Sequence, residues 1–414
     1  MYKKWQNILY RFLRWTERYT KTDMLYLTKG GFWLISGQGI GILVSLVLAV
    51  AFANLIEPEA YGNYKYVLSL AGIIGAFSLS GLGTAVLRAV ARGHEGTLQH
   101  AYHLSILWST GMVLISASGG GYYLFHGNYF LGFSLLIIGA TTPIISAGSL
   151  YRPFLSGKRA FKKLAFYGIV QSTFPTLSVL GALLLGAPLL VLIGIYFTVN
   201  ACVIKFLYLK TKQIVQNNNV DPFANRLGKH LSIMGIISTI AGKLDNVLIF
   251  QLLGGAELAI FSLATTLPDI LRSSLKHINA LAVPKFAQKT KEEMKQAVWS
   301  KTKIVFLVTG FIVFAYILLA PTLFSTLFPQ YIASIAYSQV YVLSLFASLL
   351  LASAYFDSQV AIKERYILNI VINATTIVTM IIGIYFFGIW GAIAARLVSR
   401  LINVLLSSFL IYRH

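Results

Sequence analysis

Apolar windows of membrane-spanning length recur along the whole chain, and this recurrence restricts the fold more than any single motif does. A helix needs about 20 mainly apolar residues to cross the hydrocarbon core of a bilayer. The 414 residues are 57% hydrophobic and only 11% charged, whereas about 25% of the residues in a typical soluble domain are charged. The sequence therefore predicts an all-α polytopic membrane protein.

The apolar windows predict twelve transmembrane helices, six in each half of the chain. The expected spans are 30–53, 64–87, 104–125, 130–151, 164–185, 188–209, 231–253, 257–281, 303–323, 335–356, 367–387 and 389–411. The segments between them are short, so function is expected to lie between the helices rather than in a soluble domain.

The charged residues of the loops predict the orientation. The chain has 34 basic and 13 acidic residues and a formal net charge of +21. In a soluble protein such an excess would suggest nucleic acid, but here the basic residues fall in alternate loops, as the positive-inside rule describes. The opposite loops, among them IEPEAYG, HGNY, GAP and GGAE, contain no Lys or Arg. Both termini are therefore expected on the cytoplasmic side, and no nucleic-acid partner is expected.

Four segments are expected along the chain. Residues 1–28 place apolar side chains on one helical face among basic ones, which is typical of a helix lying on an anionic membrane surface. Residues 29–210 and 231–414 form the two six-helix bundles, and residues 211–230 form a cytoplasmic linker. Similar short motifs recur about 200 residues apart (EAYGNY and ELAIF; GKRAF and IKERY). They predict a parallel repeat about a pseudo-two-fold axis along the membrane normal.

The most unusual stretch is 243–276, an apolar helical hairpin that carries five ionisable side chains. Each such group costs roughly 2.5–3.5 kcal/mol at the centre of a bilayer even on the mildest scale. Steps of three and four residues place several of them on one face of the second helix. This stripe predicts a hydrated, charged interior; its ionisable residues are Lys243, Asp245, Asp269, Arg272 and Lys276.

Further polar side chains extend this predicted cavity into other spans. Span twelve carries Arg396 and Arg400 one turn apart, span one carries Gln38, span two carries Lys65, and Arg88 follows span two. The basic groups outnumber Asp245 and Asp269, so an anionic ligand is expected.

Alternative interpretations remain for several of these groups. The side chains of Lys65, Arg88 and Lys276 could instead reach the headgroups from the ends of their helices. Asp245 could serve only to neutralise Lys243 or Arg272.

No catalytic or metal-binding pattern emerges. The chain has no phosphate-binding loop of the Walker type. His94, His100 and His103 share a loop with Glu95 but lack a strong ligand spacing, and Cys202 is the single cysteine. We therefore expect no catalytic residue, no metal site and no cofactor, and a protein that is not an enzyme.

Two long stretches carry a resemblance to a known family. GNYKYVLSLAGIIGAFSLSGLGTAVLRAVARG (62–93) and GKLDNVLIFQLLGGAELAIFSLATTLPDILRSSLKHINALAVPKFAQ (242–288) resemble the polysaccharide transporter family, which contains the Wzx-type O-antigen and exopolysaccharide flippases. The resemblance implies the fold of the multidrug/oligosaccharidyl-lipid/polysaccharide (MOP) exporters, in which two six-helix bundles form a V. It also implies that spans one, two, seven and eight face the cavity, which fits Gln38, Lys65, Lys243, Asp245, Asp269 and Arg272.

The resemblance implies a function as well. The expected activity is transfer of undecaprenyl-pyrophosphate-linked oligosaccharide from the inner to the outer leaflet of the cytoplasmic membrane by alternating access. A polysaccharide polymerase and a chain-length regulator are the expected protein partners. The alternatives are a cation-coupled multidrug exporter of the same fold, which would use Asp245 or Asp269 as its ion site, a lipid II flippase and a membrane glycan polymerase. Lipid II flippases usually have more spans than the twelve predicted here, and a polymerase needs a larger outer loop.

Overall fold

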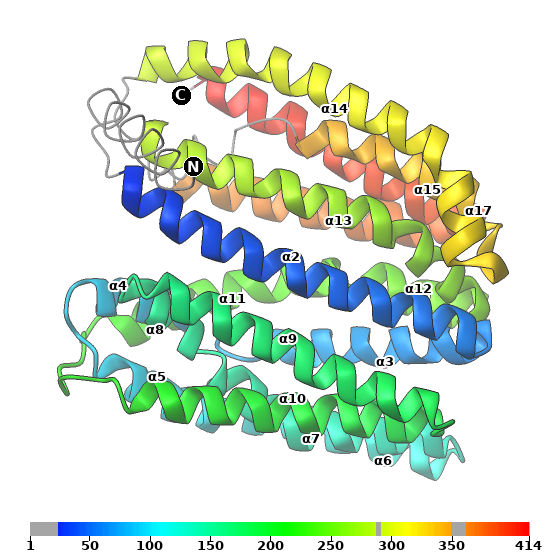
Figure 1. The fold of residues 1–414 in the computed structure, drawn as a ribbon, viewed down its shortest axis with the longest axis horizontal. Helices are drawn as coiled ribbons and strands as arrows, with labels where there is room; N and C mark the ends of the chain where they lie inside the picture. The colour runs from blue at the N-terminus through cyan, green and yellow to red at the C-terminus, as the bar shows by residue number, and fades with distance from the viewer. Residues whose placement is uncertain (1–23, 287–290, 349–361, 414) are drawn as a thin grey trace, which may run out of the picture. The chain divides into compact units, whose positions relative to one another are not determined.

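The computed structural model describes residues 24–286, 291–348 and 362–413, and every regular element within these ranges is a helix (Figure 1). The predicted interfacial helix over 1–28 lies outside the described residues, except that Met24 begins α2. The packing divides the chain into two units. Unit 1 contains the residues up to Leu48 and Phe77–Ile233, and unit 2 contains Ala49–Ala76 and Met234–His414.

Unit 1 is built from helices that correspond to spans one and three to six and to the end of span two. They are most of α2 (Met24–Leu55), then α4 (Leu82–Ala91), α5 (Thr97–Trp108), α6 (Thr110–Phe125), α7 (Tyr129–Gly148), α8 (Tyr151–Gly157), α9 (Phe161–Leu184), α10 (Leu189–Lys212) and the start of α11 (Ala224–Ala241). Its main apolar cluster lies where α4, α5, α8 and α10 meet. Leu82, Val86 and Val90 contribute to it at four-residue steps of α4, as a buried helical face requires.

Unit 2 contains the helices that position the candidate site. They are α3 (Pro58–Ala76), the rest of α11, α12 (Leu244–Leu253), α13 (Gly255–Phe286), α14 (Lys291–Leu327), the short η1 (Pro329–Tyr331), α15 (Ser334–Tyr341), η2 (Val342–Ser348) and α17 (Ile362–Arg413). Helix α3 packs so closely on α13 that a Cβ atom at Gly62 would overlap the backbone carbonyl of Gly255. The two arms of α17 turn back on each other at Gly388, whose φ of 56° favours glycine.

Two predicted spans are interrupted rather than continuous. Span two stops at Ala76 and resumes as α4 at Leu82, and span seven breaks at Gly242 and Lys243 between α11 and α12. The first break is held from within unit 1: the Gly81 N–H donates to the Ser232 Oγ at 2.9 Å, and a Cβ atom at Gly81 would overlap the backbone at Ser232. Interrupted helices at membrane depth are tolerated where the freed backbone is buried in protein or lines a wet cavity.

The predicted linker 211–230 comprises the end of α10, a non-helical segment and the start of α11. Its non-helical part packs against the turn between α4 and α5. The buried Glu95 carboxylate forms an ion pair with Lys158 and accepts the Gln216 N–H at 2.8 Å, and Asn217 accepts the Glu95 N–H at 3.2 Å. These bonds fix the segment to the rest of unit 1.

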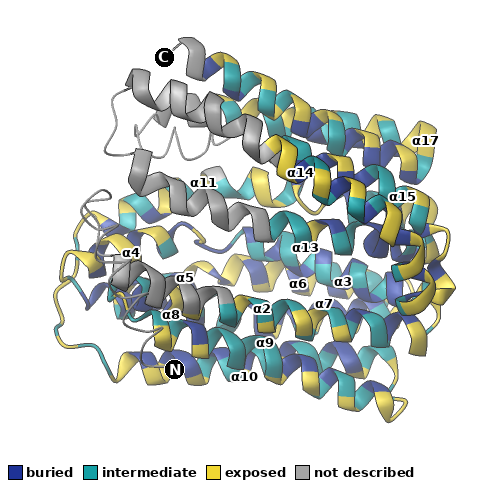
Figure 2. Cartoon of the chain, turned by 45° about the horizontal axis from the view of Figure 1, so that its top comes forward, coloured by how far each residue is buried: buried dark blue, intermediate teal, exposed yellow. Residues whose placement is uncertain are grey.

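The surface confirms a multi-pass membrane protein. Eight described helices are long and apolar enough to cross a bilayer, and two shorter apolar helices accompany them. One face of the described part of α14 is exposed (Figure 2). Leu307, Phe311, Phe314 and Leu318 lie on one face of this helix and are 62–73% exposed. Such a continuous apolar stripe is rare in water but stable in lipid.

Candidate functional site

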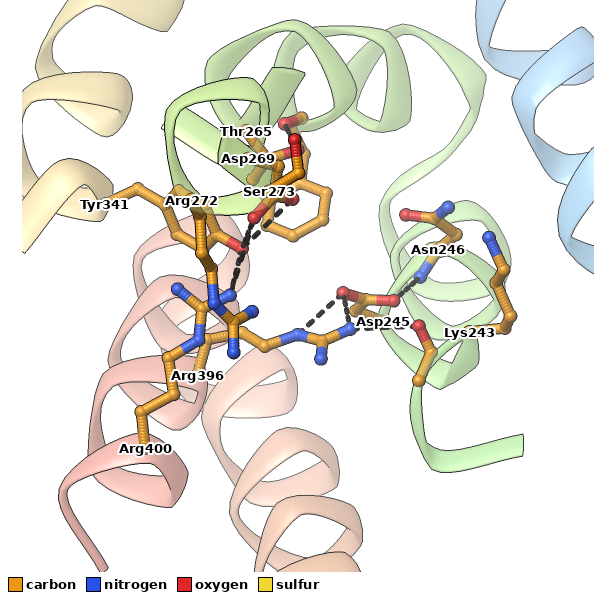
Figure 3. A pocket seen from close by; sticks show the side chains of 12 residues that line it. Lys243, Asp245, Asn246, Thr265, Asp269, Arg272, Ser273, Tyr341, Arg396 and Arg400 are labelled. Carbon is orange, nitrogen blue, oxygen red and sulfur yellow. Dashed lines mark hydrogen bonds and ion pairs between the residues drawn. The ribbon is translucent and has the colours of Figure 1, made fainter. Parts of the chain in front are cut away.

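A polar cavity of about 350 Å³ lies inside unit 2, between α12, α13, α15 and α17 (Figure 3). Its volume falls within the range, roughly 300–1,000 Å³, of pockets that bind small molecules. Six charged side chains line it: Lys243, Asp245, Asp269, Arg272, Arg396 and Arg400.

The most buried ion pair of the cavity joins α12 to α17. Asp245 lies in the first turn of α12, where the helix dipole favours a negative charge, and is 5% exposed. The Arg396 Nε donates to the Asp245 Oδ2 at 2.9 Å, and the Nη2 donates to the same oxygen. The Arg396 Nη2 also donates at 3.1 Å to the carbonyl of Gly242, at the break before α12. The interrupted helix therefore supplies part of this cation site.

A second ionic group joins α13, α15 and α17. The Tyr341 hydroxyl donates to the Asp269 carboxylate, 3.2 Å from Oδ1, and accepts from the Arg400 Nη2 at 2.7 Å. Arg400 forms a 3.6 Å ion pair with Asp269, and its guanidinium lies 4.9 Å from the centre of the Tyr341 ring. Its Nη1 donates to the Ser344 hydroxyl. Asp269 remains half exposed to the cavity.

The lining carries more positive than negative charge. Four basic and two acidic side chains give a formal excess of two positive charges. Lys243 precedes α12, and its aliphatic stem lies against Gly72 of α3, where an added Cβ would come within 3.2 Å of the Lys243 Cε. Arg272 lines the same cavity beside Arg396 and Arg400 (Figure 3). A cavity of this sign, surrounded by apolar helices, attracts anions.

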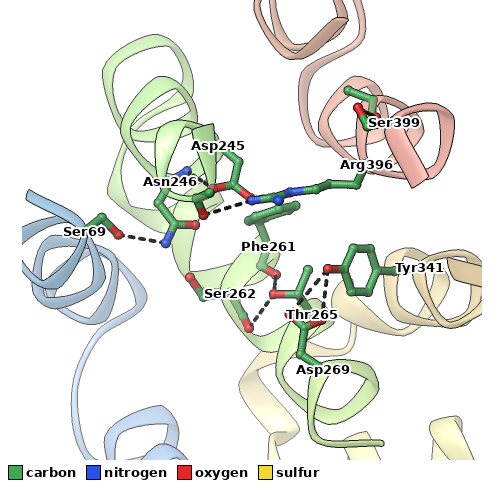
Figure 4. Close-up of polar contacts among 12 residues, drawn as sticks. Ser69, Asp245, Asn246, Phe261, Ser262, Thr265, Asp269, Tyr341, Arg396 and Ser399 are labelled. Atoms are coloured by element: carbon green, nitrogen blue, oxygen red, sulfur yellow. Dashed lines mark hydrogen bonds and ion pairs between the residues drawn. The ribbon is translucent and has the colours of Figure 1, made fainter. Parts of the chain in front are cut away.

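Uncharged polar groups fix α12 to α3 next to the cavity (Figure 4). The Asn246 Nδ2 donates to the Ser69 Oγ at 2.8 Å. Outside this view, the Gln251 Nε2 donates to the Tyr66 hydroxyl at 2.7 Å. Hydrogen bonds of this kind hold helices together in lipid. They keep the two charges at the start of α12 in place.

The structure thus brings six of the ten predicted site residues together. Of the other four, Lys65 lies on α3 with its Nζ 5.1 Å from the centre of the Tyr61 ring and does not line the cavity. Gln38 and Arg88 belong to unit 1. The side chain of Lys276 lies outside the described part. A role for any of the ten in binding substrate stays a prediction.

Sequence reasoning missed Tyr341, Asn246 and Ser273, which also line the cavity. Tyr341 is 2% exposed and bonds to both Asp269 and Arg400. In the sequence it is one aromatic residue in an apolar span, and aromatic residues are common in such spans. Its position as the last residue of the short α15 gave no periodic signal. Among the described residues, no three His, Cys, Asp or Glu side chains lie close enough to bind a metal ion.

Known proteins resemble the chain in both sequence and fold. A family model described as polysaccharide biosynthesis protein matches residues 27–290. No curated protein sequence matches. An outward-facing multidrug resistance MATE transporter of the MOP superfamily superposes with a TM-score of 0.66 at 15% identity, covering 93% of this chain and 96% of the other. The lipid II flippase MurJ in an inward closed conformation superposes with a TM-score of 0.71 at 12% identity. The match covers 92% of this chain and 87% of MurJ.

A third structure is a MOP superfamily transporter from Pyrococcus furiosus, described as having a binding pocket of reverse polarity that suggests a different function. It gives a TM-score of 0.60 at 14% identity and covers 94% of this chain and 95% of the other. At such low identities these matches establish the fold alone. They confirm the expected all-helical MOP fold.

Proposed function

The chain belongs to the polysaccharide biosynthesis protein family, and on this premise we propose that it is a lipid-linked oligosaccharide flippase. It moves undecaprenyl-pyrophosphate-linked units from the cytoplasmic to the outer leaflet of the inner membrane. It works as a transporter rather than as an enzyme, with both termini in the cytoplasm. A polysaccharide polymerase and a chain-length regulator would act on the transferred units.

The observation that carries this proposal is the positive excess of the unit 2 cavity. A pyrophosphate cannot cross hydrocarbon without compensation, because burial of an isolated charge costs tens of kcal/mol in the Born limit. Guanidinium groups bind phosphate oxygens through paired, charge-assisted hydrogen bonds. Arg272, Arg396 and Arg400 offer guanidinium groups in one cavity, and Lys243 adds an ammonium group.

The remaining lining suits the sugar rather than the lipid tail. Phe261, Thr265, Ser273 and Tyr341 provide two aromatic faces and hydroxyl groups near the cations. Hydroxyl and amide groups can hydrogen-bond to sugar hydroxyls, while the polyprenyl tail remains in lipid. In this account the substrate is released by alternating access.

Cation-coupled drug export is the competing function for this fold. It would need Asp245 or Asp269 as an ion or proton site. Asp245 already accepts two hydrogen bonds from Arg396, and Asp269 bonds to Tyr341 and lies beside Arg400. Like charges in the lining also repel a cationic drug. Both observations favour an anionic substrate.

A transfer assay tests the proposal directly. Purified protein is reconstituted into vesicles with a polyprenyl-pyrophosphate-linked saccharide, and the fraction accessible from outside is followed over time. Lys243→Gln and Arg272→Gln should each slow transfer by about tenfold or more, the equivalent of losing one charge-assisted hydrogen bond to phosphate. Lys210→Gln, which removes an exposed charge at the end of α10, is the matched control. Wild-type transfer in both cavity variants would remove the two residues from the site and refute the proposal.

A further inference from the structure

Unit 1 contains a second polar cavity that the proposed transport does not use. It has a volume of about 290 Å³ and lies where α4, α5, α7, α8, α9 and α10 converge. Two helix interruptions open onto it: residues 77–81, before α4, and the junction of α7 and α8 at Ser149 and Leu150. Irregular backbone persists at membrane depth where it is enclosed by protein or faces water, so this cavity is a built feature of the unit.

Seven of the thirteen residues that line this cavity have polar side chains that can donate hydrogen bonds, and none of the thirteen is an acid. Five serines contribute hydroxyl groups: Ser78, Ser80, Ser105, Ser146 and Ser149. Ser105 is 3% exposed and lines the cavity from α5.

Arg152 supplies the positive charge of the cavity. Its Nε and Nη2 donate to the Gln171 Oε1 at 3.1 and 2.7 Å, and its Nε also reaches the Tyr151 hydroxyl at 3.2 Å. Both acceptors are neutral, and no carboxylate of the described residues lies within ion-pair distance of Arg152. The buried acid of this unit, Glu95, pairs with Lys158. The charge of Arg152 is therefore oriented but not neutralised.

Gln171 shows how the site is arranged. Its Oε1 accepts the two Arg152 bonds and a third, at 2.6 Å, from the buried Tyr151 hydroxyl. With the oxygen fully used, its amide NH₂ group remains as a donor. The cavity thus combines an oriented guanidinium, an amide NH₂ group and serine hydroxyls, a set that matches the oxygens of a phosphate.

We propose that the unit 1 cavity is a binding site for a phosphate group, with Arg152 as the charged ligand residue and Gln171 as the residue that positions it. The phosphate belongs to an anionic membrane lipid or is free in solution; the two share the same chemistry at the site. This inference does not depend on substrate passage through the unit 2 cavity.

Titration of the purified full chain tests the proposal. Phosphatidic acid, which carries a phosphate monoester, is added to the protein in detergent, and the bound lipid is counted by native mass spectrometry. Phosphatidylcholine, which is zwitterionic and has no net charge, is the comparison. Arg152→Gln should weaken binding of phosphatidic acid by about tenfold, the effect expected for one charge-assisted contact. Lys163→Gln removes an equal charge from an exposed position shortly after Arg152 in the chain, outside the cavity, and should leave binding unchanged.

Two further measurements complete the test. Ser105→Ala/Ser146→Ala keeps the charge and removes two hydroxyl donors, so it should weaken binding severalfold even if Arg152→Gln folds poorly. Competition with inorganic phosphate identifies the source: displacement of the lipid indicates a site for free phosphate, and no displacement indicates a lipid headgroup site. Equal binding by wild type, the serine variant and Arg152→Gln, or an equal loss in Lys163→Gln, overturns the proposal. Binding to unit 2 is common to all these variants, so it cannot produce a difference between them.

Discussion

Asp245 is deeply buried and accepts hydrogen bonds from Arg396. These contacts explain why an acid is present in a cavity that we propose binds anions. Arg396 reaches it through two nitrogens, and the N-terminus of α12 stabilises the same carboxylate. Asp245 thus holds one guanidinium in a fixed orientation. Asp269 does the same for Arg400 with the help of Tyr341. We interpret both acids as groups that position cations.

Loss of one partner of the buried ion pair should lower the free energy of unfolding more than replacement of both partners by apolar residues. Asp245→Ala leaves Arg396 without its counter-charge, and loss of one partner of a buried ion pair typically costs about 3–5 kcal/mol. Asp245→Ala/Arg396→Leu removes both charges and should unfold at a higher temperature than the single variant. Thermal unfolding of the purified proteins in one detergent measures the difference. If the loss of stability in the double variant equals the sum of the losses in the two single variants, the two side chains do not interact.

The sequence predicted the charged residues of this cavity well but not their partners. Arg396 and Arg400 are one turn apart on an apolar helix, and a three-to-four-residue stripe is visible without a structure. The pairing of Asp245 with Arg396 joins residues 151 positions apart, and nothing in one sequence specifies such a contact. For this reason the interpretation of Asp245 as a neutraliser of Lys243 or Arg272 named different partners from the one observed.

At the level of elements, the crossing of α3 and α13 is set by glycine. An added Cβ at Gly62 would overlap the carbonyl of Gly255, and one at Gly255 would come within 2.9 Å of the Glu59 carbonyl oxygen. The helices therefore approach to backbone contact, as small residues permit in membranes. This contact places α3 beside α12, where Ser69 accepts from Asn246.

Substitution at this crossing should separate the two helices. Gly62→Ala adds a methyl group where there is no room, and overpacking typically costs about 1–3 kcal/mol. Gly168→Ala in the middle of α9 is the matched control, because nothing lies within 4 Å of its added Cβ. There, alanine should stabilise the helix by roughly 0.5–1 kcal/mol. Thermal unfolding of both variants provides the comparison, and an equal melting temperature for the two would contradict the close approach of α3 and α13.

The apolar windows located the helices, but the interruptions within them could not be predicted. The break after Ala76 depends on the contact of Gly81 with α11, which includes the hydrogen bond to Ser232. An interruption of five residues does not change a hydropathy average over a whole span. The break at Gly242 and Lys243 was missed as well. The sequence indicated Lys243 as a charge inside a continuous span, whereas in the structure it is the residue that precedes α12. Both breaks adjoin polar cavities, so the local features that hydropathy missed lie next to the proposed sites.

At the level of the whole molecule, composition and the recurring apolar windows were enough to predict a polytopic helical protein, and the MOP fold confirms it. The grouping of residues into compact units depended on packing. Residues 49–76 pack with unit 2, although the expected segment boundaries place them in the first half of the sequence. Hydropathy records which residues enter the membrane, whereas the grouping depends on contacts such as those between α3 and α13. The parallel repeat stays a prediction.

The most direct test of the account measures which charge the unit 2 cavity selects. The affinity of the purified protein for a polyprenyl-pyrophosphate-linked saccharide is compared with its affinity for a cationic drug, in wild type and in Lys243→Gln/Arg272→Gln. The account predicts binding of the pyrophosphate lipid by wild type, competition by free pyrophosphate, and a loss of at least tenfold in the double variant. Preferential binding of the cationic drug, or an affinity for the pyrophosphate lipid that is unchanged in the double variant, would contradict it.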